Sequence, residues 1–295
     1  MFGLKLDLMD YFDKKTLVIL DIDRLASVYY VSRYQKAFAN MPLLTSRIDN
    51  KVVNTNITYK VVQRIVQAYY SIENVDIMLA FDTRPNFLNY LNRLSREDIL
   101  KMPNDYYQQL TLIRKLGKDC NIRVLEKDGF EASSLIEKAV MDNQKYYDKI
   151  VMYSTDKFLY HLINNKVSMV RPTSELDLTV DTYKEVTKSE YNTYKLKTAL
   201  VGDSGLGIKG VERFGEVTFN KFLEKEDVLS RLDSDEELIK GSYLNAKQKQ
   251  QALDCLDYLS SREIDFLDTT ALSVDKVSLG AYLEFLDFVS LKEKL

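Results

Sequence analysis

The sequence is poor in several residue types, and each shortage excludes a class of protein. It has no tryptophan and one histidine, His161, so a metal site or proton relay built from several histidines is excluded. We expect His161 to be a surface or half-buried helix residue. Its two cysteines, Cys120 and Cys255, provide neither a disulfide framework nor cysteine-rich metal-ligand spacing, which fits a reducing compartment. No apolar run approaches the length that spans a bilayer, so no membrane partner is expected.

An excess of positive charge is also missing. The 41 basic and 44 acidic residues give a formal net charge of −3, so any binding of nucleic acid must depend on a local surface. The hydrophobic fraction of 45% and charged fraction of 29% are ordinary for a globular protein. Residues 1–15 mix charged and apolar residues, and we therefore expect no secretory leader. A chain of 295 residues fits one large domain or two closely joined ones.

Glycine is scarce overall but concentrated in one stretch, residues 203–215. Four of the ten glycines lie there, between two helix-like runs at 191–201 and 216–223. A glycine-rich turn between helices can present free amide groups to a phosphate oxygen. A tight loop between two packed helices is the alternative that the pattern leaves open.

Short apolar runs alternate with helix-like segments over the first part of the chain. This alternation predicts an α/β fold with a mostly parallel central sheet flanked by helices. The expected strands are residues 16–20, 75–82, 122–125, 149–153 and 167–170, and we expect 41–55 to be a loop. From 181 onward the pattern is helical, ending in amphipathic stretches at 247–258 and 277–295. We therefore assign an α/β domain to residues 1–180 and a helical region to 181–295.

Acidic residues follow the expected strands and begin the elements after them. Asp21, Asp82 and Asp156 stand at strand ends, Glu131 at a helix start and Asp203 at the glycine-rich turn. Because the carboxyl ends of parallel strands meet at one edge of a sheet, these acids could form a cluster. Clustered carboxylates repel one another unless a cation neutralises them, and Mg²⁺ or Mn²⁺ prefers such oxygen ligands. The associated chemistry would be phosphodiester hydrolysis. Helix capping is the alternative role for acids in these positions.

The ordered set of motifs resembles the 5′-nucleases, that is, flap endonucleases and 5′→3′ exonucleases, including phage-type enzymes and the nuclease domain of bacterial DNA polymerase I. The similar segments are residues 18–26 (V-I-L-D-I-D-R-L-A), 80–82 (A-F-D), 109–136 with its G-F-E-A-S-S, 153–159 (Y-S-T-D-K-F-L) and 194–215. The resemblance covers about residues 17–223. It implies a PIN-like fold with a helix–three-turn–helix at about 191–223, and DNA substrates with a 5′ end, flap or nick.

The resemblance also implies roles for the acids. Asp21, Asp82, Glu131, Asp156 and Asp203 match metal-binding or catalytic acids of the family, and we assign Asp82, Glu131, Asp156 and Asp203 as candidate ligands of Mg²⁺ or Mn²⁺. Four carboxylates of the family pattern are nevertheless missing. The residues at or beside the altered positions are Ser133, Ser134, Phe158, Leu206 and Gly207. Serine is a poor ligand for a hard divalent ion and phenylalanine cannot coordinate one.

Further residues are candidates for DNA contact by the same resemblance. The turn would contribute the backbone amides of glycines and two cationic side chains, namely Gly205, Gly207, Gly210, Gly215, Lys209 and Arg213. The segment 83–105 carries Arg84, Arg93 and Arg96, which suit either an arm over the site or a solvated helix-loop face. Asp23 could restore part of the lost charge or cap the following helix.

Three functions remain open. We favour a DNA-binding protein of the flap endonuclease and 5′→3′ exonuclease fold that recognises duplex or branched DNA and has weakened or lost metal-dependent activity, with a role in a replication or transcription assembly. The first alternative is an active exonuclease or flap endonuclease with a single metal held by Asp82, Glu131 and Asp156. The second is a scaffold that binds a protein through its helical C-terminal region, which would use some of the 20 tyrosines. An intracellular, cytoplasmic location is expected, including the case of a phage protein acting in its host.

Overall fold

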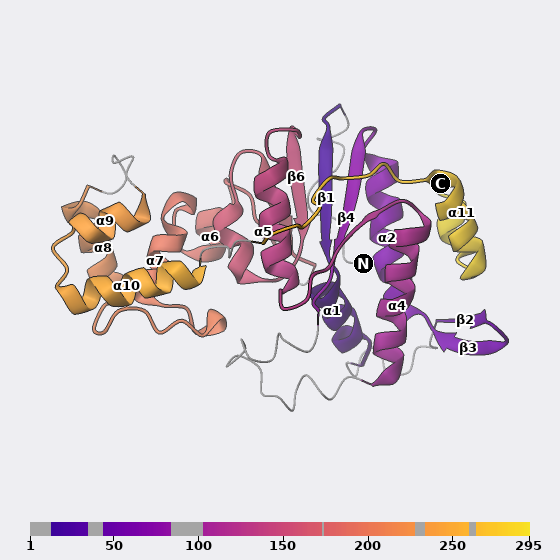
Figure 1. Cartoon of the computed structure of the whole chain (residues 1–295), viewed down its shortest axis with the longest axis horizontal. Coiled ribbons are helices and arrows are strands. Elements are labelled where there is room, and N and C mark those ends of the chain that lie inside the picture. The colour runs from indigo at the N-terminus through magenta and orange to yellow at the C-terminus, as the bar shows by residue number, and fades with distance from the viewer. Residues whose placement is uncertain (1–12, 35–43, 84–102, 173, 228–233, 260–263) are drawn as a thin grey trace.

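A five-stranded parallel sheet forms the centre of the molecule. The computed structural model describes residues 13–34, 44–83, 103–172, 174–227, 234–259 and 264–295, so Arg84, Arg93 and Arg96 lie outside the described residues. The strands are β1 (Thr16–Asp21), β4 (Val75–Ala80), β5 (Arg123–Leu125), β6 (Lys149–Tyr153) and β7 (Val167–Val170). Their order in the sheet is β5-β4-β1-β6-β7, and all neighbours are parallel. The predicted α/β fold is confirmed (Figure 1).

The central strand β1 is apolar from Leu17 to Leu20 because both faces of the sheet are covered. Val18 and Leu20 contribute to one hydrophobic core, whereas Leu17 and Ile19 contribute to the core on the opposite face. All six residues of β1 are buried. A strand buried on both faces is expected to show a continuous apolar run, and this run is what made β1 predictable.

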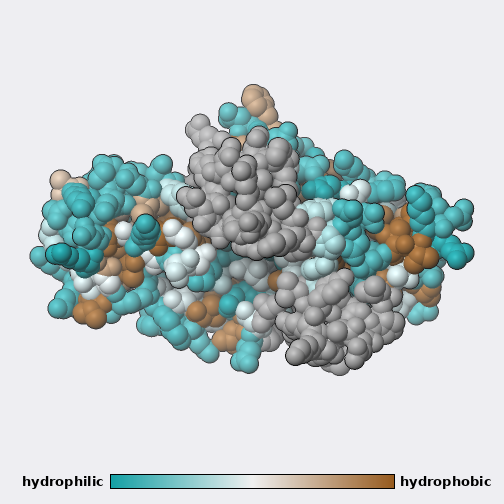
Figure 2. All heavy atoms as spheres, turned by 90° about the horizontal axis from the view of Figure 1, so that it is seen from below, coloured by the Kyte–Doolittle hydropathy of each residue, from teal (hydrophilic) through white to brown (hydrophobic). Residues whose placement is uncertain are grey.

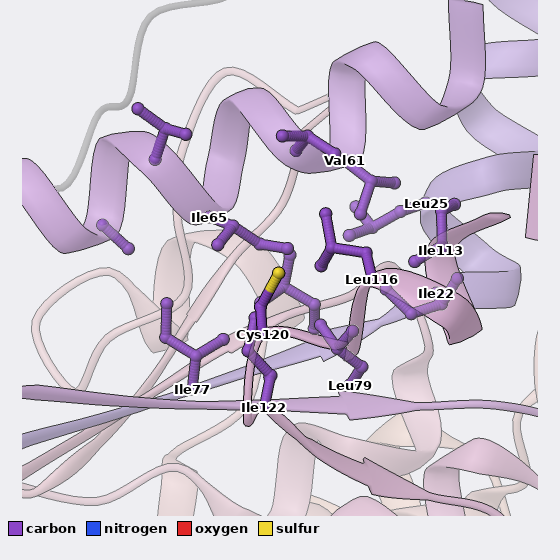
Figure 3. Close-up of a cluster of buried hydrophobic side chains, with 14 of the residues drawn as sticks. Ile22, Leu25, Val61, Ile65, Ile77, Leu79, Ile113, Leu116, Cys120 and Ile122 are labelled. Carbon is purple, nitrogen blue, oxygen red and sulfur yellow. The ribbon is translucent and has the colours of Figure 1, made fainter. Parts of the chain in front are cut away.

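Helices cover both faces of the sheet. The first face carries α1 (Ile22–Tyr34), α2 (Asn56–Ser71) and α4 (Asn104–Asp119), whose side chains meet β4 around Cys120 (Figure 3). The second face carries α5 (Ala132–Asn143) and the 3₁₀ helix η3 (Lys157–Leu162). Since β1 lies between β4 and β6, the segments that follow these three strands begin close together.

The expected loop at 41–55 contains a two-stranded antiparallel hairpin, so that expectation was wrong. Its strands are β2 (Thr45–Ile48) and β3 (Lys51–Asn54). Asp49 and Asn50 connect them with φ values of 47° and 62°, the left-handed region that a two-residue hairpin turn requires. Asn and Asp tolerate this region better than other non-glycine residues, and the Asp-Asn pair was the overlooked signal.

The helices after β7 build a third hydrophobic core at one end of the molecule, in addition to the two on the faces of the sheet (Figure 1). These elements are α6 (Tyr183–Thr187), η4 (Tyr191–Thr193), α7 (Tyr194–Val201), η5 (Ser204–Leu206), α8 (Glu216–Lys225), α9 (Asp235–Gly241) and α10 (Ala246–Leu259). Tyr183 and Tyr194 belong to the core between the sheet and α5, whereas Leu196 is the first residue of the core of the helical end. Ser234 starts α9 with a reciprocal capping box to Glu237.

The last part of the chain returns to the sheet. Leu272 bridges Ile77 of β4, and Arg123 pairs with Asp268 at 2.8 Å. Then α11 (Lys276–Phe285) and α12 (Val289–Lys292) pack into the same core as α2 and α4. Residues 264–295 therefore lie on the α/β body and not with the helices of the opposite end (Figure 1). The amphipathic stretch at 277–295, which from sequence could pack on the main body or on another chain, thus packs on the main body.

Over the residues that the structure describes, no helix is both long and apolar enough to cross a membrane. On the face seen in Figure 2, hydrophobic residues appear as separate patches among hydrophilic ones.

Candidate active site and nucleic-acid interface

Three of the predicted acids meet at the carboxyl edge of the sheet. Asp21 is the last residue of β1, Asp82 follows β4, and Asp156 follows β6. Asp21 is only 1% exposed and accepts a hydrogen bond from Ser154 Oγ at 2.5 Å. Burial raises the pKa of Asp21 well above its usual range, and the charges of Asp82 and Asp156 raise it further, against the opposing effect of Arg24. The three carboxylates are therefore close enough to influence one another.

A cation of the protein lies among these acids. Arg24, in the first turn of α1, donates from Nη2 to Asp156 Oδ2 at 2.9 Å, and its backbone N–H donates to Asp21 Oδ1 at 3.3 Å. The side chain of Arg24 is 45% exposed; its partial desolvation lowers its pKa, but the charges of Asp156, Asp21 and Asp82 outweigh that effect and raise it. Sequence reasoning missed Arg24, although its place directly after Asp21-Ile22-Asp23 was visible.

Asp82 and Glu131 are connected through the start of α5. Asp82 Oδ1 accepts a hydrogen bond from the backbone N–H of Ala132 at 2.7 Å, and Glu131 is the N-cap residue of the same helix. Asp82 therefore satisfies one of the amides that a helix N-terminus leaves without a partner. Asp23 accepts from the backbone N–H of Asp82 at 2.9 Å. Its carboxylate thus holds the end of β4 against α1.

Asp203 has a cationic partner of its own next to the sheet edge. Its carboxylate pairs with Lys157 Nζ at 3.1 Å and accepts from the backbone N–H of Leu206 at 3.1 Å, which caps η5. Lys157 directly follows Asp156 in sequence. Lys157 therefore neutralises Asp203 and connects it to the segment that follows Asp156.

The residues at this edge do not fit a divalent metal ion as they are arranged. Among the described residues, no three His, Cys, Asp or Glu side chains are grouped so that they could hold one. Asp156 Oδ1 accepts from the backbone N–H of Phe158 while its Oδ2 is held by Arg24. Phe158, at a position where the family pattern has an acid, packs against two hydrophobic cores, and Ser133 is buried. The carboxylates instead cap helices and pair with cations.

The glycine-rich turn, residues 203–215, is both tightly built and exposed. Its apolar residues Leu206, Ile208, Val211 and Phe214 anchor it in the core of the helical end. The predicted DNA-binding residues Gly205, Gly207, Lys209, Arg213 and Gly215 are exposed, and Gly210 is half-buried. Both sequence interpretations of this stretch, a packed loop and an accessible surface, are compatible with this arrangement.

Two glycines fix the shape of the turn. Gly202 and Gly210 have φ values of 91° and 68°, which side chains rarely adopt. A Cβ atom on Gly202 would lie 2.6 Å from the carbonyl oxygen of Ile208, and one on Gly210 would lie 2.5 Å from the amide nitrogen of Gly202. The backbone at residue 202 can approach the backbone at residue 210 only because both residues lack a side chain. Gly202 was not among the predicted site residues.

Comparison with known proteins identifies the family. Residues 17–195 match the family model described as the 5′-3′ exonuclease, N-terminal resolvase-like domain. The chain belongs to the 5′-3′ exonuclease family. A 5′-3′ exonuclease of Buchnera aphidicola subsp. Schizaphis graminum is 25% identical over 245 residues, which cover 81% of this chain and 80% of the relative. DNA polymerase I of Caldicellulosiruptor bescii is 28% identical over 239 residues, or 77% of this chain, but the match covers only 27% of the polymerase.

A solved structure supports the same fold. The flap endonuclease D15 of bacteriophage T5, in a pseudo-enzyme–product complex with DNA and metal ions, superposes with a TM-score of 0.57. The alignment covers 95% of this chain and 96% of that one at 16% sequence identity. At this identity the likeness shows the fold alone, and the fold agrees with the family match.

Proposed function

We propose that this chain is a DNA-binding member of the 5′-3′ exonuclease family in which metal-dependent phosphodiester hydrolysis is weakened or lost. The observation that carries the proposal is the Arg24 guanidinium on Asp156, with Asp21 held by Ser154. Both oxygens of Asp156 and one of Asp82 are engaged by the protein's own donors. The T5 enzyme described above is a complex with DNA and metal ions, which supports DNA as the ligand class of this fold.

The DNA surface that we propose is the exposed glycine-rich turn. Lys209 and Arg213 are exposed there, and Arg213 has a φ of 60°, so the backbone is bent at this residue. Backbone amides and cationic side chains in such a turn bind phosphates without reading sequence. We therefore propose duplex or branched DNA with a 5′ end, flap or nick as the partner, inside the cell and within a replication or transcription assembly.

Cleavage of a 5′-flap and of a nicked duplex, each in Mg²⁺ and in Mn²⁺, tests the loss of hydrolysis. The matched control is the double variant Asp82→Ala, Glu131→Ala. We expect the parent to cleave at the rate of the control or only slightly faster, since the acidic edge holds a metal poorly or not at all. Turnover by the parent at about 1 s⁻¹ or more that the control abolishes would contradict the proposal. It would support instead the active enzyme with a single metal held by Asp82, Glu131 and Asp156.

Charge reversal in the turn tests the DNA surface. The variant Lys209→Glu, Arg213→Glu should bind duplex DNA more weakly, and its salt dependence should be shallower by about one unit for each phosphate that these side chains neutralise in the parent. The measurement is a fluorescence anisotropy titration at several salt concentrations. Lys276→Glu, Lys294→Glu changes the net charge equally at the far end of the molecule and should bind as the parent does (Figure 1).

Equal affinity of the turn variant and the parent would remove residues 203–215 from the DNA surface. Absence of DNA binding by the parent itself at low salt would contradict the proposed function and would favour the protein-binding scaffold.

A further inference from the structure

Helix capping does not explain why an arginine, Arg24, stands at this place on the sheet edge. It lies in the first turn of α1, where an acidic side chain would be the favoured choice and where the same turn does contain Asp23. The positive end of the α1 dipole therefore disfavours a cation at this position. What surrounds the guanidinium must compensate for that cost.

The compensation comes from carboxylates that follow or end three different strands. Asp156 is 7% exposed and holds Nη2 of Arg24 at 2.9 Å, while Asp21 is buried and receives the backbone N–H of Arg24. Asp82, the third acid, contributes to the electrostatic environment of Arg24. Three acids that converge in a partly buried place repel one another, and one of them must be protonated or neutralised by a cation. Arg24 is a cation that remains charged at any pH at which the protein is folded.

We propose that Arg24 is a built-in counter-ion that takes the place of a divalent metal at the acidic edge, so that the sheet edge keeps its shape without metal. The guanidinium is already attached to the chain, so its pairing with a carboxylate costs no loss of translational freedom, whereas a dissolved ion must pay that cost. A guanidinium is also weakly hydrated, so it gives up less hydration when it pairs. A metal ion could enter only by displacing Arg24 from Asp156 and by releasing the amide of Phe158 from the same carboxylate. A counter-ion at this position would explain why hydrolysis is lost. In that respect the role of Arg24 rests on the proposed function.

Thermal unfolding of the full chain in EDTA and in millimolar Mn²⁺ tests this role. Arg24→Gln removes the charge and should lower the melting temperature in EDTA by roughly 5 °C, because the acids lose their neutralising partner. Mn²⁺ should recover at least half of that loss in Arg24→Gln, since the vacated place accepts a divalent ion. Arg24→Lys keeps a cation and should remain insensitive to Mn²⁺, as the parent should.

The matched control is Arg123→Gln, which removes an arginine from its pair with Asp268, away from the acidic edge. It should lose stability in EDTA and recover nothing in Mn²⁺. Equal responses of Arg24→Gln and Arg123→Gln to Mn²⁺ would overturn the inference.

A direct titration of Mn²⁺ into the parent, followed by electron paramagnetic resonance, tests the role even if Arg24→Gln fails to fold. The expected result is no binding above that of the Asp82→Ala, Glu131→Ala variant. Binding by the parent that this variant lacks would overturn the counter-ion role. DNA affinity of the parent measured in EDTA separates the two proposals: its absence refutes the proposed function, while the Mn²⁺ results alone refute or support the role of Arg24.

Discussion

Replacing Gly210 by alanine is expected to destabilise the fold by about 3 kcal/mol or more, from backbone strain and overpacking together. The φ of 68° at this residue is strained for any side chain, and the added Cβ would lie 2.5 Å from both the amide nitrogen of Gly202 and the carbonyl carbon of Val201. Neither neighbour is a flexible side chain that could move away. The turn must therefore separate from α7, which carries Leu196 and Leu200 of the helical core. Urea denaturation of the parent and the variant measures the loss.

Gly215 supplies the matched control for this prediction. It lies in the same turn, has a φ of −109°, and a Cβ placed on it would meet no atom within 4 Å among the described residues. Gly215→Ala should therefore change the unfolding free energy by no more than about 0.5 kcal/mol. A Gly210→Ala variant as stable as Gly215→Ala would mean that the close approach of residues 202 and 210 does not define the turn. The Gly210→Ala variant should also bind DNA more weakly, because the turn that we propose as the DNA surface loses its shape.

Much of the fold could be predicted because its signals are local. The short, largely apolar runs that became β1, β6 and β7 are almost entirely buried, as expected for strands of a parallel sheet that is covered on both faces. The convergence of Asp21, Asp82 and Asp156 followed from parallel strands with acids at their ends. The family resemblance, carried by the order of the motifs, agrees with the family match over residues 17–195.

The features that could not be predicted depend on contacts between distant residues. Arg24 and Asp156 are 132 positions apart, and Asp203 and Lys157 are 46 apart, so neither pair leaves a local pattern. The return of α11 and α12 to the α/β body is likewise invisible in their own periodicity, which shows an apolar face but not its partner. These long-range pairs decide whether the acids bind metal or the protein's own cations. For that reason the chemistry of the site was harder to predict than its position.

The pairing of His161 with Glu137 is the second feature with a large expected effect. The side chains are 11% and 4% exposed, and Nε2 of His161 lies 2.8 Å from Oε1 of Glu137. Nδ1 lies 2.6 Å from the carbonyl oxygen of Phe158, so acceptor oxygens face both ring nitrogens. The only histidine of the sequence thereby joins η3 to α5.

His161→Ala should cost about 3–5 kcal/mol of unfolding free energy, because it leaves the Glu137 carboxylate buried without a partner. Glu137 Oε2 already has no hydrogen-bond partner among the described residues, so nothing nearby replaces the imidazole. Glu137→Ala should cost less than His161→Ala, since His161 keeps the carbonyl of Phe158. The double variant should be more stable than the sum of the single losses implies, which a double-mutant cycle in urea measures.

Lys138→Ala is the control on the same helix. Its pair with Asp142 at 2.7 Å is at the surface, and its loss should cost at most about 0.5 kcal/mol. If His161→Ala proved no more harmful than Lys138→Ala, the buried pair would not hold the two elements together. The comparison bears on the site as well: η3 begins directly after Asp156 and carries Lys157, and α5 begins with the amide that Asp82 binds. Loosening the contact between η3 and α5 should therefore disturb the acidic edge, even though His161 touches none of its acids.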